Sequence, residues 1–160
     1  MHNSILIQNL SITNIHLTTM NKKEKIIAKI IDVEGIGPKY TKDLSAVGIT
    51  TTAKLLKKGA TRKGREELAE ATGISYKLIL EWVNHADLFR IKGVGEEYSD
   101  LLEEAGVDSV PELAQRNPKN LYAKLVETNE EKRLVRQLPS QRQVADWVNQ
   151  AKVLPRMVHH

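Results

Sequence analysis

The sequence predicts an all-α fold made of two tandem, small helical bundles that pack together. Three observations carry this prediction. A segment of the first half recurs in the second half at a constant offset, and capping residues and glycines punctuate both halves at short intervals. No window shows sustained alternation of apolar and polar residues, which argues against a sheet. A bundle of about 60 residues buries only a modest core, so two such units gain stability by packing on each other.

The internal repeat defines the organisation of the chain. Residues 33–49 match residues 91–107 in register, 58 positions apart, and each copy holds a Gly-apolar-Gly triplet, a tyrosine and a later glycine. The tryptophans Trp82 and Trp147 are 65 positions apart, so the second copy has gained seven residues. We expect the added residues within 130–140.

In the first copy, residues that favour helix ends delimit each helix. Pro38 suits a first helical position, and Thr51, Thr61 and Ser75 are typical N-caps. Gly48, Gly59 and Gly73 suit the left-handed residue that ends a helix. These signals predict helices over residues 38–47, 52–58, 62–72 and 75–87, preceded by a charged helix over 22–32.

In the second copy, Ser109, Thr128 and Ser140 each stand three residues before Glu or Gln, which is the capping-box pattern. Asn117 before Pro118 is a further helix start. The predicted helices cover residues 96–105, 110–116, 118–127, 130–137 and 141–153. We therefore divide the chain into a first repeat at 21–88, a second repeat at 89–154 and a tail at 155–160.

Residues 1–20 contain no Lys or Arg and lack the basic start and apolar centre of a signal peptide. Met20 is followed by a charged segment, so we expect it to be the natural start. The preceding residues are then a disordered or non-native extension. His159 and His160 are interpreted as tail or tag residues.

The charge is uneven along the chain. The formal net charge is +4, and all of the excess lies in residues 1–87, whereas residues 88–160 are neutral. This favours an anionic partner, although a solubilising surface accounts for it equally well. The absence of cysteine excludes disulfides and thiolate metal sites and fits a cytoplasmic protein. No segment approaches the roughly 20 apolar residues that span a bilayer, so we expect no membrane partner.

The glycine triplets are the leading candidates for a binding site. Each can form a tight turn whose backbone approaches another molecule, while the middle apolar side chain enters the core. The helix that follows begins with unpaired amides and the positive end of its dipole, an arrangement that suits a phosphate. The two triplets are Gly35, Ile36 and Gly37 in the first copy, and Gly93, Val94 and Gly95 in the second.

Basic residues accompany only the first triplet. Lys39 and Lys42 can point outward beside it. Further cations of the first copy could extend the same phosphate track, although a solvated helix face explains them slightly better. They are Lys54, Lys57, Lys58, Arg62, Lys63 and Arg65.

The apolar-Gly-apolar-Gly pattern followed by a helix resembles the helix-hairpin-helix motif of small, SAM-like helical bundles. The longer pattern from Glu34 through Gly48 and Leu55 to Trp82 looks like the small N-terminal domain of recombinases of the Rad51 type. The tandem arrangement over about residues 24–154 is similar to an uncharacterised bacterial family of unknown function. The resemblance implies sequence-independent contact with the DNA backbone, in repair, recombination or chromosome upkeep. It also allows a monovalent cation on the carbonyls of Gly35–Gly37, and no other cofactor is expected.

The second copy differs where this chemistry would occur. Glu96, Glu97 and Asp100 replace Pro38 and the two lysines, and carboxylates there would repel a phosphate. Its turn, formed by Gly93, Val94 and Gly95, is therefore expected to be structural. This reversal leaves a second hypothesis open: a protein-interaction module whose acidic second repeat docks a partner. That partner could be a second copy bound head to tail.

Other residues give no sign of catalysis. Trp82 and Trp147 fit core positions better than a stacking surface for bases, and Tyr40 and Tyr98 share their core face. His85 has no second ligand at helical spacing, so a metal site is not expected. The chain carries no phosphate-binding loop and no nucleophile pattern, and we expect it not to be an enzyme.

Overall fold

The computed structural model describes residues 29–33 and 35–160. Over these residues the backbone forms helices, turns and one isolated antiparallel bridge between Lys29 and Thr51, so the predicted all-α class is confirmed. The elements are the 3-10 helix η1 (Ile30–Asp32) and the α-helices α2 (Pro38–Ala46), α3 (Thr52–Gly59), α4 (Arg62–Thr72), α5 (Tyr76–Leu88), α6 (Glu96–Glu104), α7 (Val110–Ala114), α8 (Pro118–Lys132) and α9 (Gln141–Val153). None of the helices within the described residues is long and apolar enough to cross a membrane.

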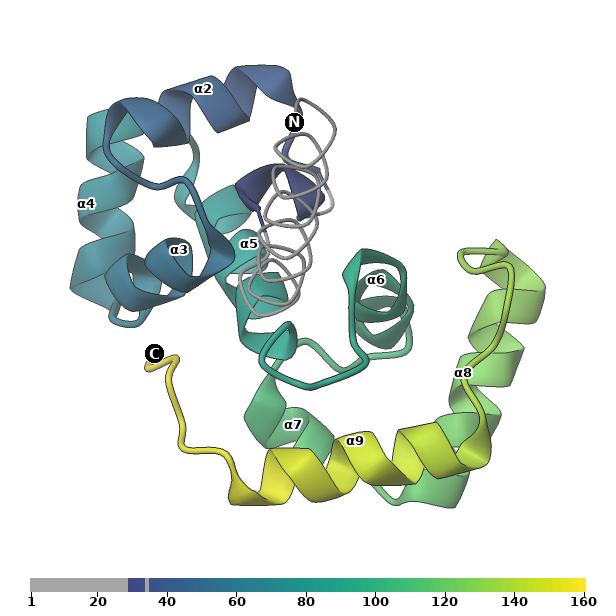
Figure 1. Cartoon of the computed structure of the whole chain (residues 1–160). Helices are drawn as coiled ribbons and strands as arrows, with labels where there is room; N and C mark the ends of the chain where they lie inside the picture. Colours follow the sequence, from purple (N-terminus) through teal and green to yellow (C-terminus); the bar gives the residue numbers. More distant parts are fainter. Residues whose placement is uncertain (1–28, 34) are drawn as a thin grey trace, which may run out of the picture.

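The helices form two groups, each around its own hydrophobic core (Figure 1). η1 and α2–α5 surround the first core, and α6–α9 surround the second. The last residue of α5, Leu88, packs in the second core, whereas Trp82 and Ala86 of the same helix pack in the first. The two repeats are therefore joined through a shared helix.

The repeat is visible in the geometry of both glycine turns, which we call the first glycine turn (residues 35–37) and the second glycine turn (residues 93–95). Gly35 and Gly93 have φ angles of +85° and +94°. A Cβ on Gly35 would lie 3.5 Å from Trp82 Nε1, and one on Gly93 would lie 3.0 Å from Trp147 Nε1. The indole of each tryptophan therefore packs directly against the left-handed glycine of its own turn.

Both tryptophans are core residues, as predicted. Trp82 is 2% exposed and Trp147 is 1% exposed. Tyr40 lies on Trp82 with ring centres 5.0 Å apart, and Tyr98 lies on Trp147 at 5.3 Å, both in tilted packing. Neither indole is available to stack on a base.

Most predicted helix ends are confirmed: Gly48 and Gly73 are left-handed, whereas Gly59 has no positive φ and is the last residue of α3. The side chains of Thr51, Thr61, Ser75, Ser109, Asn117 and Ser140 each accept a hydrogen bond from a first-turn amide of the helix that follows. The predicted helix over 130–137 is wrong. Thr128 does not start a helix, because its side chain is buried inside α8 and the helix continues to Lys132.

A loop replaces the remainder of that predicted helix. Arg133 ends α8 with a left-handed φ of 51°, and the side chain of Asn129 bonds both the amide and the carbonyl of Val135. The added residues of the second copy are thus divided between a longer α8, of 15 residues against 11 in α4, and the loop before α9. Residues 22–28 of the predicted helix over 22–32 lie outside the described residues. At the end of the predicted range the structure has the short 3-10 helix η1. The predicted extension at 1–20 also lies outside the described residues.

The chain after α9 does not project into solvent. Residues 155–160, which we call the C-terminal strap, run from the second repeat back to the first (Figure 1). The side chain of Val158 enters the first core and is 4% exposed. The His159 amide donates to the carbonyl of Ala60 at 2.8 Å, between α3 and α4. The sequence predicts only a tail here, since no local pattern indicates its contacts.

Candidate nucleic-acid interface

The first glycine turn leads directly into α2. The Ile36 amide donates to the Val33 carbonyl at 3.0 Å, which closes the turn and buries the Ile36 side chain. Gly35 is exposed, and a Cβ placed on Gly37 would meet nothing within 4 Å. The backbone of this turn is therefore open on its outer side, as the prediction requires.

The start of α2 is compatible with an approaching anion. Gly37 is its N-cap and supplies no side-chain hydrogen bond, and the first turn of α2 contains no carboxylate. The first amides of a helix have no partner within the helix, and the dipole places partial positive charge there. Lys39 and Lys42 are exposed beside this end. Asp43, in the second turn, is the first carboxylate along α2.

The second glycine turn has the same shape and the opposite charge. Val94 is buried as Ile36 is, and Gly95 is an N-cap without a side-chain bond. Glu96 and Glu97 occupy the first turn of α6. A cavity of about 520 Å³ beside this turn is lined by Gly93, Gly95, Glu96, Glu97, Tyr98, Arg136 and Gln137. The carboxylates stabilise the start of α6 and disfavour a phosphate.

Two carboxylates of α6 form ion pairs with neighbouring helices while remaining about a third exposed. Glu103 pairs with the buried His85 of α5, and Glu104 pairs with Lys132 of α8. The other ring nitrogen of His85 lies 3.3 Å from the Ser99 hydroxyl. His85 is thus a polar link between the repeats. The position of His85 on the apolar face of α5 indicates that the side chain is buried. No local sequence pattern indicates its partners on α6.

Asp108, before α7, lies against Glu112. Burial raises the pKa of Asp108 to about 6, with further contributions from its hydrogen bond and charge interaction with Glu112 and the charge of Glu103. The same hydrogen bond lowers the pKa of Glu112. The folded-state pKa of Asp108 is above its unfolded value of about 3.9, so its contribution to stability is lost as the pH rises from about 4 to about 6.

Asp108→Asn is therefore expected to raise the melting temperature at pH 7.5 and to change it little at pH 4, because Asn cannot ionise. The gain should stay below about 1 kcal/mol, since the carboxyl is partly solvated. Thermal unfolding followed by circular dichroism at both pH values measures it, with the exposed Asp146→Asn as the control. Equal melting temperatures of Asp108→Asn and the parent at pH 7.5 would contradict the assignment.

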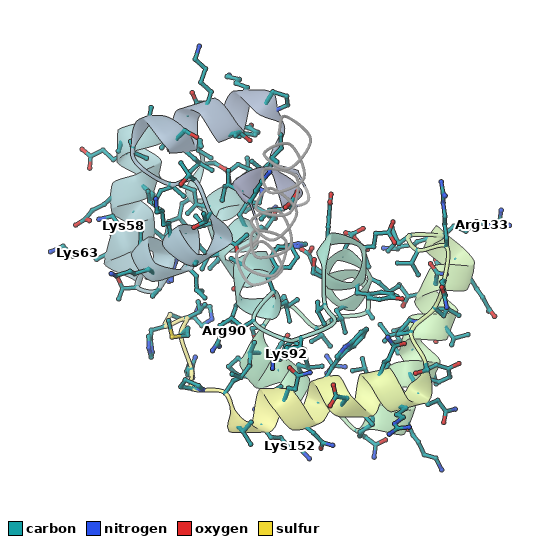
Figure 2. The ribbon with its side chains drawn as sticks, in the orientation of Figure 1. Lys58, Lys63, Arg90, Lys92, Arg133 and Lys152 are labelled. Carbon is teal, nitrogen blue, oxygen red and sulfur yellow. The ribbon has the colours of Figure 1, made fainter. Side chains whose placement is uncertain are left out.

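Arg62 and Lys63 do not lie beside the first glycine turn. They begin α4 at the end of the first repeat far from the start of α2 (Figure 1), and Figure 2 shows Lys63 at that outer edge. Arg62 is paired with Glu66 at 3.0 Å, and Lys58 with Glu67 at 2.6 Å. The structure therefore does not bring Arg62 and Lys63 together with Lys39 and Lys42, because α3 carries the chain away from the turn before α4 begins (Figure 1).

Arg65 is not part of any exposed basic surface. It is 0% exposed and points into the first repeat, where its guanidinium donates to backbone carbonyls. Its position three residues before Leu68, on the core side of α4, is the signal that indicates burial. The expectation that Arg65 belongs to an exposed basic surface is therefore wrong.

Within the described part of the chain, no group of three or more His, Asp or Glu side chains is placed to hold a metal ion. The predicted monovalent cation on the carbonyls of Gly35–Gly37 stays a prediction.

Residues 34–154 match the sequence profile of a family described as a domain of unknown function, DUF4332. The chain belongs to this family. The match spans both glycine turns and ends at Leu154, just before the C-terminal strap of this DUF4332 protein. No curated protein and no solved structure matches the chain significantly.

Proposed function

We propose that this DUF4332 protein is a non-enzymatic binder of the DNA phosphate backbone and that it contacts DNA through the first glycine turn and the start of α2. One observation carries the proposal. The N-terminus of α2 has a glycine N-cap, no carboxylate in its first turn and two exposed lysines, Lys39 and Lys42, beside it. Backbone amides and lysines contact phosphates without reading bases, so the binding is sequence-independent.

The second glycine turn serves as an internal comparison. It has the same backbone geometry, but Glu96 and Glu97 stand where the first turn has Pro38 and Lys39. The two turns therefore have the same backbone shape and differ in charge. We assign the structural role to Gly93, Val94 and Gly95.

The size of the basic surface sets the strength of binding. Of the four predicted DNA-contacting cations Lys39, Lys42, Arg62 and Lys63, all within the described residues, Lys39 and Lys42 lie beside the turn (Figure 1). Two phosphate contacts correspond to a slope of roughly −2 in a plot of log K against log salt concentration. We expect weak binding that is measurable at low salt.

The double variant Lys39→Glu/Lys42→Glu tests the site. We expect its affinity for labelled duplex or single-stranded DNA to fall at least about tenfold near 50 mM salt, since two attractive contacts become repulsive. Fluorescence anisotropy across a salt series measures the effect. Glutamate near a helix N-terminus is favourable, so the fold should persist.

Lys119→Glu/Lys152→Glu is the matched control. It makes the same change in net charge on exposed residues of α8 and α9, and Figure 2 shows Lys152 on the side of the molecule opposite α2. This variant should lose much less affinity. Equal losses in both variants would mean that overall charge, not the first glycine turn, governs binding. No binding by the parent at low salt would refute the proposal and favour a protein partner.

The acidic second repeat is a weaker candidate for docking a protein. Two of its carboxylates, Glu103 and Glu104, are committed to His85 and Lys132. A partner that used them would first have to break these ion pairs.

A further inference from the structure

Arg65 is a buried cation whose hydrogen-bond partners within the described residues are all uncharged. Its Nη1 donates to the carbonyls of Gly59 at 2.8 Å and Ala60 at 3.3 Å, its Nε to the hydroxyl of Tyr76 at 3.0 Å, and its Nη2 to the carbonyl of His159 at 2.8 Å. A buried guanidinium is tolerated only when its donors are satisfied. The acceptor for Nη2 is a backbone carbonyl of the C-terminal strap.

The second repeat has no such arginine. Arg65 is the fourth residue of α4, and the fourth residue of α8 is Leu121, which is 2% exposed. An apolar residue is thus sufficient for the core at this position. The arginine occurs in the repeat on which the strap docks, and we attribute the difference to recognition of the strap.

The contacts of the strap are those by which proteins read an extended peptide. The amide and the carbonyl of His159 are both bound, by Ala60 and Arg65 respectively, while its side chain is exposed. The preceding residue, Val158, inserts its side chain into the first core. Backbone bonds at one residue and a side-chain pocket for its neighbour give affinity and selectivity separately.

The strap reaches this site from the other repeat. The Pro155 carbonyl accepts a hydrogen bond from Arg90 Nη1 at 2.9 Å, and Figure 2 shows Arg90 beside the strap. Met157 and Arg90 also line a cavity of about 460 Å³ between the repeats. The family match ends at Leu154, so the site lies within the family domain and its occupant lies outside it.

We propose that the junction of α3 and α4 is a peptide-binding site and that the C-terminal strap is its resident ligand. The ligand is an extended segment with a branched apolar residue at the Val158 position, followed by a residue that offers its backbone amide and carbonyl. Arg65 recognises the carbonyl. The site is separate from the first glycine turn, so it does not rest on DNA binding.

The test displaces the strap and supplies the same segment from outside. In the full chain, Val158→Asp removes the apolar anchor. A fluorescein-labelled peptide of residues 153–160 should then bind this variant saturably, and should bind the parent at least about tenfold more weakly, because the parent site is occupied in cis. The same peptide carrying Val158→Asp should also bind at least about tenfold more weakly. Anisotropy measures all three.

Arg65→Met in the Val158→Asp background distinguishes recognition of the peptide backbone by Arg65 from non-specific binding of the peptide. The labelled peptide should bind this double variant at least tenfold more weakly, provided that its circular dichroism spectrum matches that of Val158→Asp. If Val158→Asp does not fold, His159→Pro in the full chain removes the amide donor without burying a charge and takes its place. Absence of peptide binding to a folded strap variant, or equal binding to the parent, would overturn the proposal.

Discussion

Alanine in place of Asp87 is expected to lower the free energy of unfolding by about 3–5 kcal/mol, because it breaks a buried ion pair from one side. Asp87 is 0% exposed at the end of α5. One carboxylate oxygen accepts from Arg90 Nε at 2.8 Å, and the other accepts from the Val110 amide at 3.0 Å. Without the carboxylate, Arg90 Nε and the first amide of α7 lose their acceptors together, and the guanidinium keeps its bond to the Pro155 carbonyl. Urea unfolding followed at 222 nm measures the change.

The control for Asp87 is Asp146→Ala, since the side chain of Asp146 is exposed on α9 and accepts a hydrogen bond from the Gln150 side-chain amide of the same helix. Its effect should stay within about 0.5 kcal/mol. Asp87→Asn should be intermediate, because the amide oxygen can still accept one of the bonds. A loss below about 1 kcal/mol for Asp87→Ala would show that water reaches the site and replaces the carboxylate.

Trp82→Ala and Trp147→Ala are each expected to cost about 3–5 kcal/mol, since each removes a fully packed indole from its core. Their effects on DNA should differ. Trp82 supports Gly35 and Tyr40, so its loss should loosen the first glycine turn and weaken DNA binding. Trp147 supports Gly93 and Tyr98, and its loss should leave DNA affinity nearly unchanged.

This pair is its own control, because the two tryptophans are equally buried and equally placed in their repeats. Denaturation gives the stabilities, and anisotropy at a temperature where both variants remain helical gives the affinities. Equal losses of DNA affinity would mean that binding follows global stability and not the geometry of the first turn.

The helices and the turns could be predicted because their signals are local. Thr61, Ser75 and Ser140 cap the helices that follow them through bonds to residues three positions away. Glycine at positions 35 and 93 permits the positive φ that each turn needs. Thr128 shows the limit of such patterns. A capping sequence forms a cap only where the backbone leaves the helix, and the burial of Thr128 keeps α8 intact.

The features that escaped prediction depend on residues far apart in the chain. Arg65 and His159 are 94 positions apart, and neither position signals the other. Lys63 and Lys39 are both basic and lie in the first copy, which favours a common surface. The direction of α3 separates them (Figure 1). Charge patterns identify candidate residues, but only the path of the chain decides which of them share a surface.

The shared helix α5 also bears on how a duplicated chain can diverge. Because it supplies Trp82 to one core and Leu88 to the other, deleting the first copy would remove Leu88 from the second core, and deleting the second copy would expose Leu88 to solvent. Selection for a folded chain therefore acts on both copies at once and retains the buried residues that shape each turn. The exposed residues beside the turns escape that constraint. The residues beside the two turns can therefore differ in charge, with Lys39 in one copy and Glu97 in the other, while both turns keep the same shape.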